Sequence, residues 1–440
     1  MKPLCVISCP IDTQSGYGAR ARDVVKALYE LKKDEWEVKV LSQRWGSTEW
    51  GYIKQHEEEW GWMSELLLPN NQLTRQPEYW FMITVPNEFQ PIGKLMNVGV
   101  TAGIETTICH AGWIDGVNRM NLTLVSSEHA KQVFQNSQFE ERDQQGNVRR
   151  QIKLEKPVEV LFEGIDLNKF FHVEQKSLPK TDFIESLDEI KEEFCYLFVG
   201  HWLQGDLGED RKNVSGTVKL FLETFKNKKK KPALILKTTK VSNSIMDREE
   251  ILEKIDEIRK TVAGNDLPNI YFLHGDISEE DVNHLYNHSK VKAMVYLGHG
   301  EGFGRPLLEF CAAKKPIIAS GWSGHMDFLN PEFTVLLPGA LQNLHRSAVV
   351  ENMLLAESQW FKVDQPAAKK ALEDVYENYN KYTDNAKRQS HHARTNFSYD
   401  KMKEKLGEYL NTFPKPMELK LPQLKKVELP TLPQLKKIEQ

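Results

Sequence analysis

Short apolar segments alternate with amphipathic segments along most of this chain, and the alternation restricts the folds that it can adopt. Residues 4–8 and 37–41 have the pattern of buried strands, and residues 19–31 between them place their apolar side chains at helical spacing. The same order continues through residues 81–162. Strands that alternate with helices are typical of a parallel sheet with helices on both faces. We therefore expect an α/β, doubly wound architecture.

A second array of the same kind follows a polar stretch, residues 168–193. Strands are expected at 194–199, 232–237, 270–273, 293–297 and 316–319, and helices at 214–225, 248–262, 279–287 and 307–314. Two arrays of similar size predict two Rossmann-like domains. Such domains face each other across a cleft at the carboxyl ends of their strands.

The pattern divides the chain into five parts. They are an N-terminal domain (1–170), a linker (171–193), a C-terminal domain (194–345), helices that pack back on the domains (346–413) and a tail (414–440). In the tail, Leu-Pro-Gln-Leu-Lys-Lys-Val-Glu at 421–428 recurs with one change at 432–439. Two copies are too few for a solenoid, so we expect a flexible or docking tail with a possible protein partner. The alternative is a low-complexity extension without a role.

Composition excludes several classes of protein. The 58 Lys and Arg nearly balance the 62 Asp and Glu, which gives no support to a nucleic-acid coat or a strongly cationic membrane binder. No apolar run approaches the roughly 20 residues of a transmembrane helix, and the first ten residues do not have the pattern of a signal peptide. Five scattered cysteines predict reduced thiols rather than a disulfide scaffold. We expect a cytoplasmic protein.

The most informative segment is a glycine-rich connection between a strand and a helix, Gly-His-Gly-Glu-Gly-Phe-Gly-Arg-Pro-Leu-Leu-Glu at 298–309. Its glycines allow the backbone to approach a ligand closely, and the helix that follows offers free N–H groups to an anion. Glu301 in the loop and Glu309 in the helix are suited to sugar hydroxyls, because a carboxylate accepts several hydrogen bonds. The alternative is an ordinary turn with solvated glutamates.

Together with residues 312–325, this segment closely resembles the C-terminal signature of family 4 glycosyltransferases. The signature consists of a Glu, Gly-Phe-Gly, and a second Glu eight positions after the first. The resemblance covers most of residues 1–410. It implies the GT-B fold and a retaining, hexosyltransferase-type enzyme. The donor is then a nucleoside-diphosphate sugar bound to the C-terminal half, and the acceptor binds to the N-terminal half.

The segment that holds the donor diphosphate in this family resembles Phe198–Trp202 and Arg211–Asn213 here. Lys212 matches one of the two family cations. At the other cation position this chain has His201, and an acidic insertion, Leu203–Asp210, separates the two. Arg211 is positioned to supply the missing charge. Cations at a helix start oppose the helix dipole, so a nearby anion would explain both Arg211 and Lys212.

The resemblance assigns the remaining site residues by position. The residues implied at the donor are Gly16, Arg211, Lys212, Ile277, Gly302, Phe303, Gly304 and Glu309, and those implied at the reacting centre are Glu301, Glu105 and His110. In this assignment Glu309 holds the ribose and Glu301 the transferred sugar. A lone histidine such as His110 is also often structural.

The expected reaction is a front-face displacement, in which the departing phosphate oxygen accepts the proton of the acceptor hydroxyl. The chain contains no Asp-x-Asp motif, so we expect neither a metal nor a cofactor beyond the co-substrate. Two alternatives stay open. One is another GT-B-like enzyme, such as an epimerase or an inverting transferase. The other is a non-catalytic scaffold or virion-associated protein that docks through the tail. The base, the sugar, the oligomeric state and the acceptor (glycan, lipid, protein or nucleic acid) also stay open.

Overall fold

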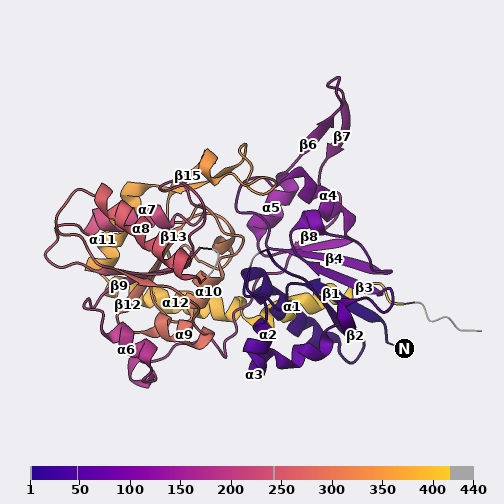
Figure 1. The fold of residues 1–440 in the computed structure, drawn as a ribbon, viewed down its shortest axis with the longest axis horizontal. Helices are drawn as coiled ribbons and strands as arrows, with labels where there is room; N and C mark the ends of the chain where they lie inside the picture. Colours follow the sequence, from indigo (N-terminus) through magenta and orange to yellow (C-terminus); the bar gives the residue numbers. More distant parts are fainter. Residues whose placement is uncertain (1, 47, 241–242, 417–440) are drawn as a thin grey trace, which may run out of the picture.

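The described chain forms two lobes, each built on a six-stranded sheet (Figure 1). This computed structural model describes residues 2–46, 48–240 and 243–416, so the repeated segments of the tail lie outside the described residues. Within each sheet all neighbouring strands are parallel. Two Rossmann-like lobes confirm the predicted fold.

The first sheet has the strand order β2-β1-β3-β4-β5-β8. Its strands are β1 (Leu4–Cys9), β2 (Glu37–Ser42), β3 (Tyr79–Ile83), β4 (Met96–Thr101), β5 (Leu122–Val125) and β8 (Val158–Val160). Its main helices are α1 (Gly16–Lys32), α4 (Ala111–Arg119) and α5 (Glu128–Asn136). Every residue of β1 is buried, as expected for a strand with helices on both faces of its sheet. The periodicity missed α4 and two short helices, α2 (Tyr52–Gln55) and α3 (Glu57–Trp60).

The second sheet has the order β11-β10-β9-β12-β13-β14. Its strands are β9 (Cys195–His201), β10 (Ala233–Thr239), β11 (Ile270–Leu273), β12 (Val291–Tyr296), β13 (Ile317–Ser320) and β14 (Val335–Leu337). Its helices are α7 (Val214–Phe225), α8 (Ile245–Thr261), α9 (Glu279–Asn287) and α10 (Arg305–Cys311), and α6 (Asp182–Asp188) precedes the sheet. The chain changes direction across this sheet between β9 and β12. In open α/β sheets, ligands bind at such a switch point, beyond the carboxyl ends of the strands.

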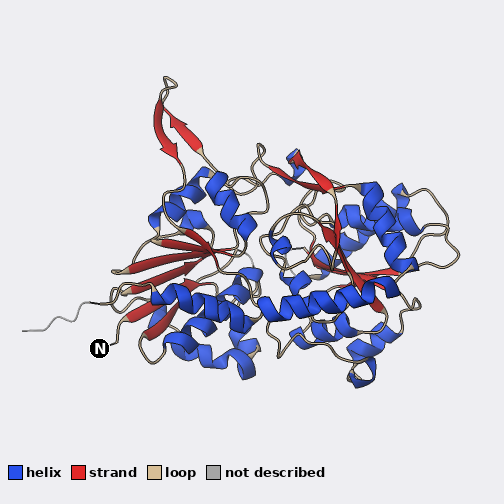
Figure 2. Cartoon of the chain, turned by 180° about the vertical axis from the view of Figure 1, so that it is seen from behind, coloured by secondary structure: helices blue, strands red, loops and turns tan. Residues whose placement is uncertain are grey.

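The segment 346–413 was predicted to be mostly helical, and this is wrong for its first part. Within this segment β16 (Gln359–Val363) pairs antiparallel with β15 (Gly339–Asn343), which precedes the segment, and α-helices begin only with α11 (Gln365–Glu377). All five residues of β15 are exposed, so no apolar alternation marks this strand in the sequence. The helices that follow are α12 (Asn380–Asn396) and α13 (Tyr399–Asn411). α12 packs on α10 in the second lobe and α13 on α1 in the first, so the chain returns to where it began (Figure 2).

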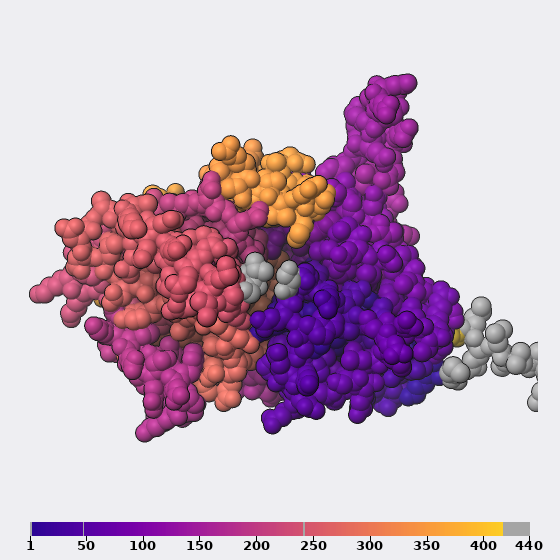
Figure 3. All heavy atoms as spheres, in the orientation of Figure 1, coloured from indigo at the N-terminus to yellow at the C-terminus, as the bar shows by residue number. Residues whose placement is uncertain are grey.

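A second hairpin projects from the first lobe (Figure 3). It pairs β6 (Phe139–Arg142) with β7 (Val148–Ile152) and confirms the predicted exposed loop or hairpin at 140–151. Among the residues that the structure describes, no helix has the length and apolar character needed to span a membrane. All five cysteines are buried free thiols.

Candidate functional site

Two charged side chains meet at the switch point of the second sheet. Lys212 lies in the connection that follows β9, and Glu301 lies in the glycine-rich loop that follows β12. Because β9 and β12 are parallel neighbours, both connections leave the same edge of the sheet. There the Lys212 ammonium donates a hydrogen bond to Glu301 Oε1, and both residues are more than nine-tenths buried.

Arg211 adds a second positive charge to this pair. Its Nη1 lies 3.8 Å from Glu301 Oε2. Burial by itself raises the pKa of Glu301, but the charges of Lys212 and Arg211 outweigh burial and lower that pKa to about 2. Glu301 is therefore ionised at neutral pH and can accept hydrogen bonds.

A carboxylate of the first lobe contacts the same cations. Glu105, in the loop after β4, accepts a hydrogen bond of 2.5 Å from Arg211 Nη1. Burial lowers the pKa of the Arg211 guanidinium, whereas Glu105 and Glu301 raise it, and the net direction is upward. The structure thus brings together four of the predicted residues, Glu105, Arg211, Lys212 and Glu301, from connections in both lobes.

The glycines of the loop allow the backbones of the two lobes to approach closely. A Cβ atom on Gly302 would lie 2.8 Å from the carbonyl oxygen of Ala102, and one on Gly300 would overlap the carbonyl oxygen of Glu105. Gly304 has a φ of 96°, which favours glycine. The side chain of Phe303 is buried and packs on Phe328, with 5.0 Å between the ring centroids, so only its backbone is available to a ligand.

Glu309 lies in α10, beside an arginine that joins the lobes. Arg305 Nε donates to Glu309 Oε1 over 3.0 Å, and Arg305 Nη1 donates to Asp23 Oδ2 of α1 over 2.7 Å. Burial raises the pKa of Glu309 to about 7, although Arg305 acts in the opposite direction. The sequence analysis missed Arg305 and Asp23. Arg305 is the first residue of α10, where a cation opposes the helix dipole, so the argument used for Arg211 and Lys212 could have found it.

Three further predicted residues are His110, Ile277 and Gly16. His110 caps α4, because its Nδ1 accepts a hydrogen bond from the N–H of Gly112 at 3.1 Å. Ile277 follows β11 and packs on the core. Gly16 begins α1, and a Cβ atom there would meet nothing within 4 Å. Across the described parts of the chain, no hydrogen bond or ion pair joins His110 or Ile277 to Glu301 or Glu309, so their roles stay predictions.

The acidic insertion has a structural role in setting the two cations. Its last residue, Asp210, is fully buried and accepts hydrogen bonds from the N–H groups of Val214 at 2.7 Å and Ser215 at 3.2 Å. Asp210 therefore caps α7, and Arg211 and Lys212 follow it directly. His201 lies at the end of β9, with its Nδ1 3.0 Å from Thr239 Oγ1.

Two cavities of very different size lie in the second lobe. A cavity of about 10 Å³ lies beside Lys212 and Glu301, which is room for about one water molecule. The large cavity of the second lobe, about 870 Å³, lies behind the glycine-rich loop. Within the described ranges, no three His, Cys, Asp or Glu side chains are grouped as metal ligands, and metal independence stays a prediction.

Comparison with known families matches the second lobe. The family model described as "Glycosyl transferases group 1" matches residues 214–345, which include Glu301 and Glu309. A search of curated protein sequences finds no significant match.

Solved structures share the fold over nearly the whole chain. Anabaena Alr3699/HepE, in complex with UDP and glucose, superposes with a TM-score of 0.59 at 12% identity, over 93% of this chain and 99% of that chain. The sucrose-phosphate synthase of Thermosynechococcus elongatus gives 0.55 at 14% identity, over 93% and 98%. A glycosyltransferase from Rickettsia africae gives 0.58 at 13% identity, over 93% and 97%. At these identities the likeness establishes the two-domain GT-B fold.

Proposed function

We propose that this protein is a glycosyltransferase that moves a hexose from a nucleoside-diphosphate sugar to an acceptor hydroxyl, with retention of the anomeric configuration. The observation that carries the proposal is the cluster of Lys212, Arg211 and Glu301 at the switch point of the second sheet. It combines two cations for a diphosphate with an ionised carboxylate for a sugar. The match of this lobe to a glycosyltransferase family model supports the same activity.

The ion pairs of the cluster indicate how a donor would bind. Lys212 and Arg211 are paired with Glu301 and Glu105. A diphosphate offers oxygens that are strong partners for ammonium and guanidinium groups. We propose that the phosphates take over both cations and that Glu301 is thereby released to accept hydrogen bonds from the sugar. Glu309, in the next helix, then holds the ribose.

Catalysis in this scheme depends on the leaving group. Lys212, Arg211 and the backbone N–H groups of residues 302–304 stabilise the charge that develops on the departing phosphate. A phosphate oxygen then accepts the proton of the acceptor hydroxyl on the face that the leaving group vacates. Contact between the lobes excludes water, which protects the donor from hydrolysis. We propose that fixed cations suffice without a metal ion, and that the five reduced thiols correspond to a cytoplasmic protein.

The first test is ligand-induced thermal stabilisation with a panel of nucleoside diphosphates and their sugars. UDP and UDP-glucose come first, because Anabaena Alr3699/HepE has been solved with them. A ligand present at about 100 times its Kd adds roughly 2.7 kcal/mol to the free energy of unfolding. We expect one base to raise Tm by several degrees and Glu309→Ala to abolish that shift.

The matched control is Thr181→Ala, which removes the side-chain cap of α6 and should lower the basal Tm while leaving the nucleotide shift intact. If no nucleotide stabilises the folded wild type, the proposal fails. The donor with the largest shift then enters a product assay, in which the anomeric coupling constant of the product distinguishes retention from inversion.

A further inference from the structure

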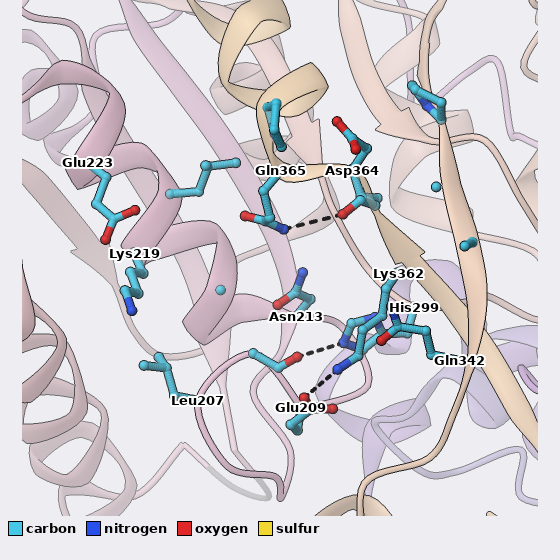
Figure 4. A pocket seen from close by; sticks show the side chains of 18 residues that line it. Leu207, Glu209, Asn213, Lys219, Glu223, His299, Gln342, Lys362, Asp364 and Gln365 are labelled. Carbon is cyan, nitrogen blue, oxygen red and sulfur yellow. Dashed lines mark hydrogen bonds and ion pairs between the residues drawn. The ribbon is translucent and has the colours of Figure 1, made fainter.

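A cavity of about 870 Å³ opens between α7, the β15–β16 hairpin and the start of α11 (Figure 4). Its volume falls within the range of about 300–1,000 Å³ that is typical of small-molecule sites. Lys219 and Glu223 line it from α7, and His299, Gln342 and Lys362 lie across from them. None of these five residues belongs to the cluster of Lys212, Arg211 and Glu301.

Two residues that line this cavity carry buried acceptor atoms without a donor. Asn213 is 3% exposed, and its Oδ1 accepts no hydrogen bond within the described part of the chain, although its Nδ2 donates to the carbonyl oxygen of Leu297 at 2.9 Å. Glu209 Oε2 is likewise buried and unpartnered, whereas Glu209 Oε1 accepts from Lys362. A buried acceptor without a donor is destabilising, so the lining favours a ligand that supplies hydrogen-bond donors.

The charges around the cavity favour an uncharged ligand. Three carboxylates, those of Glu209, Glu223 and Asp364, face two ammonium groups, those of Lys219 and Lys362. An anion would bring further acceptors to a site that needs hydrogen-bond donors. A polycation would be repelled by the two ammonium groups. Hydroxyl groups both donate and accept, so they satisfy carboxylates, amides and ammonium groups alike.

The cavity also shares a wall with the predicted donor site. His299 Nε2 lies 3.0 Å from the carbonyl oxygen of Gly208, which lines the cavity, and the N–H of His299 donates to the carbonyl oxygen of Arg211. His299 stands two residues before Glu301. We propose that this cavity is a second binding site, for an uncharged oligosaccharide, on the outer side of the glycine-rich loop.

Binding is measured without any nucleotide, by calorimetry and saturation-transfer NMR with maltotriose, mannotriose and chitotriose. The blocking variant is Ala340→Trp, because Ala340 lines the cavity from the exposed strand β15, where a bulky side chain displaces nothing buried. Its matched control is Leu341→Trp, since successive side chains of a strand point to opposite faces. Glu223→Met is a second variant that removes an acceptor and keeps the side-chain length.

We expect at least one trisaccharide to bind the wild type and Leu341→Trp equally, and to bind Ala340→Trp and Glu223→Met about tenfold more weakly or worse. Circular dichroism confirms that each variant is folded. The inference is overturned if no trisaccharide binds the wild type, if both variants bind as well as the wild type does, or if glucose 6-phosphate or spermidine binds in preference.

Binding that is lost in Glu301→Gln and kept in Ala340→Trp would place the saccharide between the lobes. That outcome overturns the second site and leaves the proposed transferase standing. Conversely, the absence of a nucleotide shift would refute the transferase without affecting the saccharide titration.

Discussion

Lys212 donates a hydrogen bond to Glu301 although 89 residues separate them in the chain, and both side chains are buried at the edge where β9 and β12 end. Each side chain is thus the ionic partner of the other in the absence of a ligand. In the proposed transferase, donor binding exchanges this ion pair for contacts with phosphate and sugar, which would link the stability of the protein to its affinity for the donor.

Replacing one residue of this ion pair should lower the free energy of unfolding far more than replacing both residues. Lys212→Met leaves the Glu301 carboxylate buried with Arg211 at 3.8 Å as its remaining cation, which should cost about 3–5 kcal/mol of unfolding free energy. The double variant Lys212→Met with Glu301→Gln should recover most of that loss. Urea unfolding of the wild type, the single variants and the double variant gives the coupling energy directly.

The matched control for this cycle is Lys401→Met, which breaks an exposed pair with Glu404 and should change the unfolding free energy by less than about 1 kcal/mol. If Lys212→Met and Lys401→Met lowered the unfolding free energy equally, the Lys212–Glu301 pair would not behave as a buried ion pair.

The raised pKa of Glu309 predicts a pH-dependent stability. The folded pKa of about 7 lies above the ordinary value of 4.5, so the folded state binds more protons between these limits. The stabilising contribution is complete below about pH 4.5 and is lost as pH rises through about 7, by roughly 3 kcal/mol for a shift of this size. Unfolding free energies of wild type and Glu309→Gln at about pH 5 and about pH 8 test this.

The unfolding free energy of the wild type should exceed that of Glu309→Gln by less at about pH 8 than at about pH 5. An advantage that grows with pH would mean that Arg305 holds the carboxylate ionised and that the pKa is lowered instead.

Two neighbouring glycines at the start of α1 should respond differently to the same substitution. A Cβ atom on Gly16 would meet nothing within 4 Å, whereas one on Gly18 would overlap the carbonyl oxygen of Thr13. Gly16→Ala should therefore leave the unfolding free energy unchanged or raise it by about 0.4–1 kcal/mol, and Gly18→Ala should lower it. If Gly16 faces the donor, Gly16→Ala also weakens nucleotide binding, which calorimetry would detect. Unchanged affinity would remove Gly16 from the donor site.

Arg305 should control how closely the lobes approach. It bonds Asp23 in the first lobe and Glu309 in the second, so Arg305→Ala removes a polar link between the lobes. We expect a larger radius of gyration by small-angle X-ray scattering and a lower Tm. Arg150→Ala, which breaks an ion pair with Asp115 at the projecting hairpin, should change neither the gap between the lobes nor nucleotide binding.

Several elements could be read from local pattern with little error. The predicted bounds of α7 and α9 coincide with the structure, because their apolar residues recur at the helical period and each element buries its own face. The strand β15 was missed because it buries none of its residues, so its sequence shows no alternation of apolar and polar side chains. Glu301 and Glu309 could be chosen as site residues from the sequence, because both lie in one short segment made of a loop and the helix that follows it.

By itself, therefore, the sequence determined the two β-α arrays, the glycine-rich connection and the two cations that precede α7. The tertiary structure alone decided the pairing of those charges. Arg211 meets Glu105 and Arg305 meets Asp23 across 106 and 282 positions of chain. A helix or a strand is predicted from a short run of neighbouring residues, and such a run carries no information on how the two lobes contact each other. The closeness of Gly300 and Glu105 and the burial of their neighbours arise only when the lobes come together.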